Sequence, residues 1–500
     1  MKNIKIIQYF LVILITFSAC DDFVDVDPIG VEAEDYFNSE EEYESALLGA
    51  YDLLQATFQN VLISVVASDD IIAGGDAFNY DQPTLQNINS MIHTPADNNQ
   101  LREVWQLMYA GINRANYLHQ YKLKNIAGDT VKFAGKDALY GEVYFLRSFY
   151  YFSLVRMFGD VPLFVDRRLG VEDTRTLTRS PKANVYKQIE IDLLAAIAVL
   201  PVVQTEKGRA TKYAAQALLG KVYLYQNKYT EAAAMLENVI GKYSLVNNFN
   251  SIFLLAGENG PESVFEIQYS NGSATYDWGH PTRNQGNLLV QQVGVRGMSG
   301  INGMPYADGW STNLPTQNLA SAFTAGDSRK ATTIFDVAAY KTANPSFDVK
   351  YLVAPYRNTG FYDGKFLPRI GETSGQLELN YTNNFRTIRY ADVLLMAAEA
   401  NNKATAPNDI KAQTYLNEVR RRAFGNNAND ISTTGNTLYD AILNERRLEL
   451  AMEGERFFDL VRTGKAAAIL TPLGFRAGKH EVFPIPQGEV DNGLSQNPNY

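Results

Sequence analysis

Glutamates recur at every fourth position in NERRLELAMEGERFF (residues 444–458), the stretch of this chain best suited to acid–base chemistry. They are Glu445, Glu449 and Glu453. On one helix face, two such carboxylates can serve a glycosidase as general acid and as base or nucleophile. Arginines are interleaved with them, at Arg446, Arg447 and Arg456. Because nearby arginines favour ion pairs over a carboxylate with a raised pKa, the pattern predicts a structural role, with a surface glycoside hydrolase as the alternative.

Histidine and cysteine are too scarce and too scattered for the common metal sites. The four histidines are His93, His119, His280 and His480, and the only cysteine is Cys20. None of them has metal-ligand spacing to another, which argues against a zinc centre. The chain also lacks a G-x-x-x-x-G-K-[ST] phosphate loop and a G-x-S-x-G nucleophile elbow. The sequence therefore predicts no metal ion, no cofactor and no catalytic residue.

Cys20 stands where an export signal ends. Two lysines near the start precede an almost wholly apolar run over residues 6–17, and Ser18 and Ala19 supply the small residues that a signal peptidase requires. The apolar run is too short for a membrane span, which needs ~20 residues. A lone cysteine in an exported chain cannot close an internal disulfide, so its position indicates a thiol that is chemically used.

The order of apolar core, small residues and cysteine resembles the bacterial lipoprotein box. This resemblance implies a signal peptide over residues 1–19 and lipidation of Cys20; an ordinary signal peptide before an unmodified Cys20 is the alternative. Aspartates follow at once, at Asp21, Asp22, Asp25 and Asp27. They resemble the signal that sends Bacteroidetes-type lipoproteins to the outer face of the outer membrane. We therefore expect residues 20–42 to be a lipidated acidic tether that leads into the fold, with the protein anchored in the cell outer membrane.

Aromatic side chains in polar loops are the candidate ligand contacts. A ring in a Gly- and Asn-rich segment has fewer core neighbours than one on a helix face, and exposed rings can stack on sugar faces for ~1 kcal/mol each, the range for aromatic pairs. The candidates are Trp278, Trp310, Tyr276, Tyr306, Phe78 and Tyr80. The alternative for each is a hydrophobic plug that pins its loop to the scaffold. The net charge of -10 argues against nucleic acid as a partner.

Amphipathic helices must position these loops. Apolar side chains recur at three- and four-residue steps over residues 137–160, and Gly159 is placed to end that helix. Residues 180–201 predict a second helix, with Ser180 as its cap and Pro181 in its first turn.

Residues 208–243 predict a helix hairpin of the tetratricopeptide type. Leu219, Gly220 and Tyr223 reproduce its L-G-x-x-Y core, and Ala232 supplies the small residue of the second helix. Further helix pairs are expected from 389–400 to 414–423 and from residue 437 onward. Since a lone repeat cannot bury its own face, several should stack into one scaffold.

Between these helical blocks, residues 251–384 are rich in Gly, Asn, Ser and Pro, and long irregular segments of this kind are usually functional. Residues 67–82 form a smaller loop of the same character. The sequence therefore predicts a mainly α fold, a tetratricopeptide-like helical-repeat scaffold with a large irregular loop-rich region packed on it.

Seven strings resemble, in order, the SusD/RagB family of outer-membrane nutrient-binding lipoproteins. They are CDDFVDVDP, WQLMYAGINRAN, GEVYFLRSFYYFSLVRMFGDVPL, GRATKYAAQALLGKVYLY, RYADVLLMAAEA, NERRLELAMEGERFFDLVR and FPIPQGEVDNGLSQNPNY. The resemblance runs from Cys20 to Tyr500. It implies an N-terminal helical region over 43–250, a ligand-binding loop region over 251–384 and a C-terminal helical region over 385–500. Arg209 and the FPIP string match family strings whose expected role is folding.

The resemblance also implies a function without catalysis. We expect a cell-surface binding protein that captures oligosaccharides or polysaccharides and delivers them to a SusC-type TonB-dependent outer-membrane transporter, its partner. One alternative is a peptide-binding, RagB-type lid of an oligopeptide transporter. Weak binding suits a protein that must release its ligand, and micromolar to millimolar affinity needs only ~4 to 8 kcal/mol.

Overall fold

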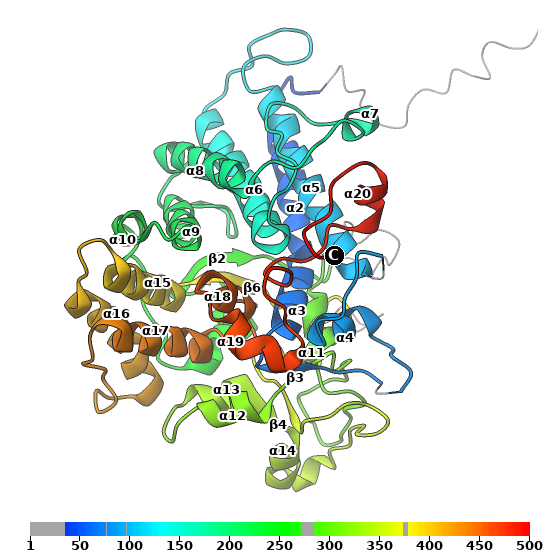
Figure 1. Ribbon diagram of the computed structural model, residues 1–500, viewed down its shortest axis with the longest axis vertical. Helices are drawn as coiled ribbons and strands as arrows, with labels where there is room; N and C mark the ends of the chain where they lie inside the picture. Colours follow the sequence, from blue (N-terminus) through cyan, green and yellow to red (C-terminus); the bar gives the residue numbers. More distant parts are fainter. Residues whose placement is uncertain (1–35, 77, 97, 273–284, 374–378) are drawn as a thin grey trace, which may run out of the picture.

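The fold is mainly α, as predicted, with a helical array and a loop-rich end (Figure 1). The computed structural model describes residues 36–500 apart from residues 77, 97, 273–284 and 374–378. The predicted signal peptide and Cys20 therefore lie outside the described residues. Within the described part of the chain, no helix combines the length and apolar character that crossing a bilayer requires.

The described part of the chain before residue 250 consists mainly of helices and connecting loops. The helices are α2 (Glu40–Asp52), η3 (Leu53–Thr57), α3 (Phe58–Val66), α4 (Pro83–Asn89), α5 (Asn99–Gln120), α6 (Lys136–Phe158), α7 (Val171–Thr174), α8 (Lys182–Val199), α9 (Lys212–Tyr225) and α10 (Tyr229–Leu236). The only strand described before residue 250 is β1 (Ile71–Ala73).

Helix α6 is the central helix of this half and is buried along most of its length, between α5 and α8. It ends as predicted at Gly159, whose φ of 73° is the left-handed conformation that glycine adopts readily. The predicted start of α8 was wrong. Ser180 pairs through its backbone with Val161, Pro181 takes the cap position, and the first free amide, that of Lys182, donates to the Asp160 carboxylate at 2.7 Å.

The predicted helix hairpin over 208–243 is confirmed as α9 and α10, joined by a turn in which Asn227 has a φ of 56°. Gly220 lies where the two helices touch: a Cβ built there would come within 2.5 Å of Leu236 Cγ. The absence of a side chain at Gly220 therefore allows α10 to pack directly on α9, as the tetratricopeptide pattern requires.

The array continues through the C-terminal helices. These elements are β6 (Phe385–Arg389), α15 (Tyr390–Lys403), α16 (Asp409–Phe424), α17 (Gly435–Glu449), α18 (Arg456–Arg462), α19 (Ala466–Leu470), η8 (Thr471–Leu473) and α20 (Gln487–Asp491). Successive contacts run from α8 through α9 and α10 to α15, and from α15 to α16 and α17. The helices therefore form one stack, although α10 and α15 are far apart in the sequence (Figure 1).

Residues 251–384 contain only short elements, in agreement with the predicted irregular region. They are η5 (Leu255–Gly257), β2 (Ser263–Ile267), α11 (Leu288–Val293), β3 (Asn313–Pro315), α12 (Gln317–Ala322), α13 (Arg329–Thr333), β4 (Ile334–Asp336), α14 (Val337–Ala343), η7 (Pro345–Phe347) and β5 (Phe361–Asp363), preceded by η4 (Phe249–Phe253). The strands pair antiparallel as β1 with β3, β2 with β6 and β4 with β5. The boundaries at 43–250, 251–384 and 385–500 stay a prediction.

Two histidines that are remote in the sequence meet in the fold. The rings of His93 and His480 lie 5.4 Å apart, and His93 Nε2 is 3.1 Å from the hydroxyl of Tyr500. Burial lowers the pKa of His93 to about 3 and that of His480 to about 4. The pair is therefore neutral and packs the end of the chain against the helices.

Candidate functional site

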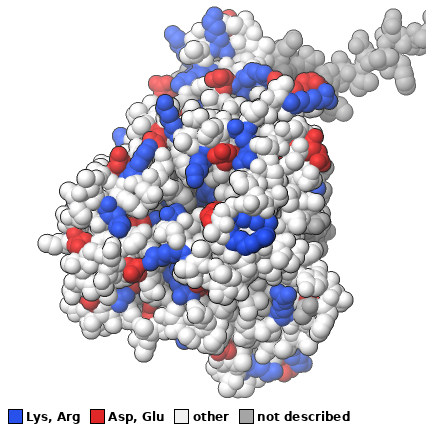
Figure 2. All heavy atoms as spheres, viewed as in Figure 1, with Lys and Arg blue, Asp and Glu red and all other residues white. Residues whose placement is uncertain are grey.

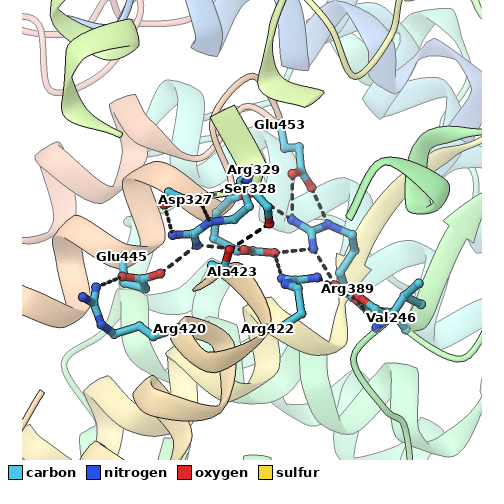
Figure 3. Close-up of polar contacts among 12 residues, drawn as sticks. Val246, Asp327, Ser328, Arg329, Arg389, Arg420, Arg422, Ala423, Glu445 and Glu453 are labelled. Carbon is cyan, nitrogen blue, oxygen red and sulfur yellow. Dashed lines mark hydrogen bonds and ion pairs between the residues drawn. The ribbon is translucent and has the colours of Figure 1, made fainter. Parts of the chain in front are cut away.

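The three glutamates of the 444–458 stretch are buried in an ion-pair network (Figure 3). Glu445 contacts Arg329 and Arg420; Glu449 contacts Arg329, Arg389 and Arg422; Glu453 contacts Arg389 and Lys365. The side chains of Glu445, Glu449, Arg329 and Lys365 have no exposed surface. We call these residues, with Asp327 and Glu262, the buried ion network.

Glu449 shows why this network is structural. Burial alone would raise its pKa, but the guanidinium groups of Arg422, Arg389 and Arg329 outweigh burial and hold the pKa well below the usual value. A carboxylate that stays ionised and inaccessible can be neither a general acid nor a nucleophile for a glycan. The predicted structural role of the glutamates agrees with this geometry.

The prediction of one helix face was wrong in detail. Helix α17 ends at Glu449, and Met452 and Gly454 take left-handed φ values of 70° and 86° before α18 begins. Glu453 therefore reaches the network from a turn. The interleaved arginines pair with carboxylates other than these three glutamates: Arg446 binds Asp392 and Asp459, while Arg447 and Arg456 bind an aspartate pair near β1.

The loop that carries Phe78 and Tyr80 is held beside the loop that carries Trp310. Strand β1 pairs with β3, and beyond β1 the Gly74 amide donates to the Thr312 carbonyl at 2.8 Å. A Cβ at Gly74 would lie 1.7 Å from the Ser311 carbonyl oxygen, so only glycine allows this approach. A third segment joins them, because Asp76 bridges to Tyr356. We call loops 74–82, 294–311 and 350–357 together the aromatic-loop site.

Asp76 shapes the first of these loops. Its Oδ1 accepts hydrogen bonds from the amides of Phe78 and Asn79, at 2.7 and 2.9 Å. The hydrogen bonds from the Asn79 and Phe78 amides lower the pKa of Asp76, which therefore stays ionised. The loop turns both rings outward: Phe78 is 80% exposed and Tyr80 is 52% exposed. Tyr80 and Ser311 both have a positive φ, a strain that persists only where the surroundings impose it and that is common at binding sites.

Arg296 joins the three loops. Its guanidinium lies 4.2 Å from the ring centroid of Tyr356, pairs with Asp81 at 3.2 Å and donates to the Trp310 carbonyl at 2.7 Å. This arrangement places a fixed carboxylate and a fixed guanidinium near exposed aromatic rings. Such a surface offers apolar faces together with hydrogen-bond donors and acceptors.

The structure brings only some of the predicted ligand contacts together. Phe78, Tyr80 and Trp310 belong to the aromatic-loop site, although Trp310 is partly buried against the main core. Tyr306 also belongs to loop 294–311, but its ring packs edge-on against Phe335 and Tyr340, at 5.2 and 5.3 Å, in a small separate core. Tyr276 and Trp278 lie outside the described residues. The ligand role of all six stays a prediction.

Sequence reasoning missed Arg296 and Tyr356. Both stand in the loop-rich region, and neither is distinguished there by type or spacing from its neighbours. The one available signal was that Tyr356 follows Pro355 in an irregular segment, the setting that also singled out the other loop aromatics.

An aspartate pair fastens the root of loop 74–82 to the C-terminal helices. Asp69 binds Arg456 at 2.8 Å, and Asp70 accepts from Arg447 Nε at 2.8 Å. The Asp70 carbonyl also accepts from the amide of Thr316, just after β3. These contacts fix where β1 begins and therefore where the exposed rings stand.

Charges of both signs are interspersed over the face shown in Figure 2. Such a surface lacks the concentrated positive charge that a nucleic-acid backbone requires. Among the described residues, no group of three or more His, Cys, Asp or Glu side chains is arranged to hold a metal ion.

The chain matches two families of known proteins. Residues 353–500 match the SusD family, and residues 22–224 match a family described as "Starch-binding associating with outer membrane". SusD-like protein P2 from Formosa agariphila is 26% identical over 534 aligned positions, covering 100% of both chains.

Solved structures resemble the chain over nearly its whole length. A laminarin-binding SusD-like protein is 34% identical with a TM-score of 0.82, covering 93% of this chain and 100% of its own. Surface glycan-binding protein A from Bacteroides thetaiotaomicron, in complex with laminarihexaose, is 28% identical with a TM-score of 0.79, covering 92% of this chain and 100% of its own. Both are named for binding rather than for catalysis. The chain thus belongs to the SusD/RagB family.

Proposed function

We propose that this protein binds a glycan at the outer cell surface, through the aromatic-loop site. The observation that carries the proposal is the 34% identity, over all of its length, to a protein named for laminarin binding. A laminarin-type glucan is therefore the first ligand to test.

The chemistry of the aromatic-loop site supports this ligand class. Sugar rings present apolar faces and a rim of hydroxyl groups, which match the exposed rings of Phe78 and Tyr80 and the ion pair of Asp81 with Arg296. A few such contacts at ~1 kcal/mol each give weak, reversible binding. That suits transfer of the ligand to another protein.

We further propose that Cys20 carries the lipid anchor and that the ligand passes to a SusC-type TonB-dependent transporter. The lone cysteine after an export signal and the match to a family associated with the outer membrane support the anchor. Holding both proteins in one membrane raises their effective concentration. Mass spectrometry should find acyl chains on Cys20, and purification under gentle detergent should recover a large β-barrel; recovery of an unmodified, solitary chain would contradict both.

The ligand proposal is tested by calorimetry with laminarihexaose, beside an array of glycans and peptides. The chain from residue 21 onward keeps every described element and is compared with the double variant Phe78→Ala/Tyr80→Ala. Removing two ring–sugar contacts of ~1 kcal/mol each should weaken binding by about tenfold or more. The thermal midpoint should hold, because both rings are largely exposed.

Ile410→Ala is the matched control, since Ile410 is an equally exposed apolar residue on α16. It should leave binding unchanged. Equal affinity of the parent and the double variant would place the ligand elsewhere, and peptide binding without glycan binding would favour the peptide-carrying alternative.

A further inference from the structure

Four consecutive apolar residues, Leu352 to Pro355, are exposed on loop 350–357. Leu352 is 47% exposed and Val353 is 52% exposed. Single exposed apolar residues are common on protein surfaces, but a run of this length normally reflects a function, because these side chains would be more stable in contact with another apolar surface. We call residues 352–355 the apolar shelf.

The apolar shelf is held between the other two loops of the aromatic-loop site. On one side, the amide of Leu352 donates to the Arg296 carbonyl at 2.9 Å. On the other side, the amide of Arg357 donates to the Gly75 carbonyl at 3.0 Å. The shelf therefore has a fixed place beside the loop that carries the two exposed rings.

Gly297 supports the first residue of the shelf. A Cβ built on Gly297 would lie 2.5 Å from Leu352 Cγ, so the leucine side chain rests against the bare backbone of this glycine. Contact on one face restricts the side chain before any ligand arrives. Binding on its other face then costs less conformational entropy than binding to a freely rotating side chain.

The size of the shelf fits a small chemical group better than a protein. Four aliphatic residues that are about half exposed offer on the order of 200 Å² of apolar surface. Each side of a standard protein–protein interface buries ~800 Å². The shelf is therefore large enough for an apolar substituent on a sugar, while the neighbouring aromatic rings provide the surface on which the sugar itself stacks.

We propose that the aromatic-loop site prefers glycans that carry small apolar substituents, with the methyl group of an O-acetyl or O-methyl substituent seated on the apolar shelf. This inference rests on the proposed glycan function and narrows its ligand class. An unsubstituted sugar presents only hydroxyl groups to the shelf. Burying one methyl group there should raise the affinity about fourfold, which corresponds to ~0.8 kcal/mol.

A competition between substituted and unsubstituted ligands tests this preference. The parent chain is mixed with laminarihexaose and with a pool of laminarihexaoses that each carry one O-acetyl group at a random position; a second pool carries one O-methyl group instead. Liquid chromatography with mass spectrometry of the bound fraction resolves the isomers and gives their ratio to the unsubstituted hexaose. At least one isomer should be enriched about fourfold.

Variants of the shelf should remove this enrichment. Leu352→Ser/Val353→Ser should bring the ratio close to one, because the methyl group would then meet hydroxyl groups. Val353→Thr keeps the size of the side chain and replaces one methyl by a hydroxyl, so it should lower the ratio even if the double variant disturbs the loop. Ile410→Ser, at an exposed apolar residue on α16, is the matched control and should keep the ratio of the parent chain.

The outcomes separate this inference from the proposed function. Binding of laminarihexaose without enrichment of any isomer, or enrichment that both shelf variants retain, would overturn the preference and leave glycan binding in place. If the parent chain bound neither the substituted nor the unsubstituted hexaoses, both proposals would be contradicted.

Discussion

Replacing Glu449 by glutamine tests whether the buried ion network holds the scaffold together. The substitution keeps the shape of the side chain and one oxygen acceptor but removes the charge. Glu449 carries the carboxylate that Arg329, Arg389 and Arg422 share, at 3.0, 2.8 and 2.5 Å. In the variant, the remaining carboxylates must balance these guanidinium groups in an environment without water.

The expected loss can be worked from these contacts. Removing one partner of a buried ion pair costs ~3 to 5 kcal/mol. Unfolding entropy is ~2 cal/mol/K per residue, so a 500-residue chain has on the order of 1 kcal/mol/K. Dividing the free-energy loss by the unfolding entropy predicts that Glu449→Gln lowers the thermal midpoint by ~3 to 5 °C.

Differential scanning calorimetry at pH 7 measures this midpoint. Asp440→Asn is the matched control on the same helix, because Asp440 is mostly exposed and its pair with Lys465 is worth at most ~1 kcal/mol. It should shift the midpoint by less than ~1 °C. If Glu449→Gln behaves like Asp440→Asn, the network does not stabilise the fold and the structural explanation of the glutamates fails.

Three further predictions concern packing, pH and the candidate site. Gly220→Ala should lower the thermal midpoint by ~1 to 3 °C because its Cβ would meet Leu236, whereas Gly49→Ala, with open space around it, should not. Burial lowers the pKa of His93 to about 3, so below pH ~6.5 this histidine binds a proton in the unfolded chain but not in the folded protein. The free energy of unfolding should therefore be ~2 kcal/mol smaller at pH 5. His93→Phe should reduce the difference between the thermal midpoints at pH 7.5 and pH 5. Trp310→Ala should lower both the midpoint, by a few degrees, and the affinity for laminarihexaose, because this ring is partly buried on the main core; an unchanged midpoint would show that its packing is dispensable.

The scaffold was predictable where the signal is local. Gly159 ends α6 and Gly220 lets α10 approach α9, and both follow from the type of one residue at one place in a periodic pattern. The cap of α8 was not predictable in this way. Its partner, the carboxylate of Asp160, comes from the previous loop and not from the residue beside the helix.

In the candidate site too, features set by local sequence were predictable and features set by tertiary packing were not. Composition identified Phe78 and Tyr80 as candidate exposed rings, and it identified Tyr306 equally. Only tertiary packing shows that the half-buried ring of Tyr306 packs against other aromatic rings. The role of Arg296 depends on three loops meeting around it. The spacing of residues along the chain does not predict that these three loops come together.

The buried ion network can be completed only late in synthesis of the chain. Arg329, Arg389 and Arg422 leave the ribosome before Glu449 and Glu453, and each of the first two needs at least one of these later carboxylates. In a chain that stops short of α17, Asp327 and Glu262 would be the network carboxylates left to balance the three guanidinium groups. The protein therefore cannot complete its scaffold until nearly the whole chain has been synthesised, and truncation before α17 should prevent folding rather than remove only one helix.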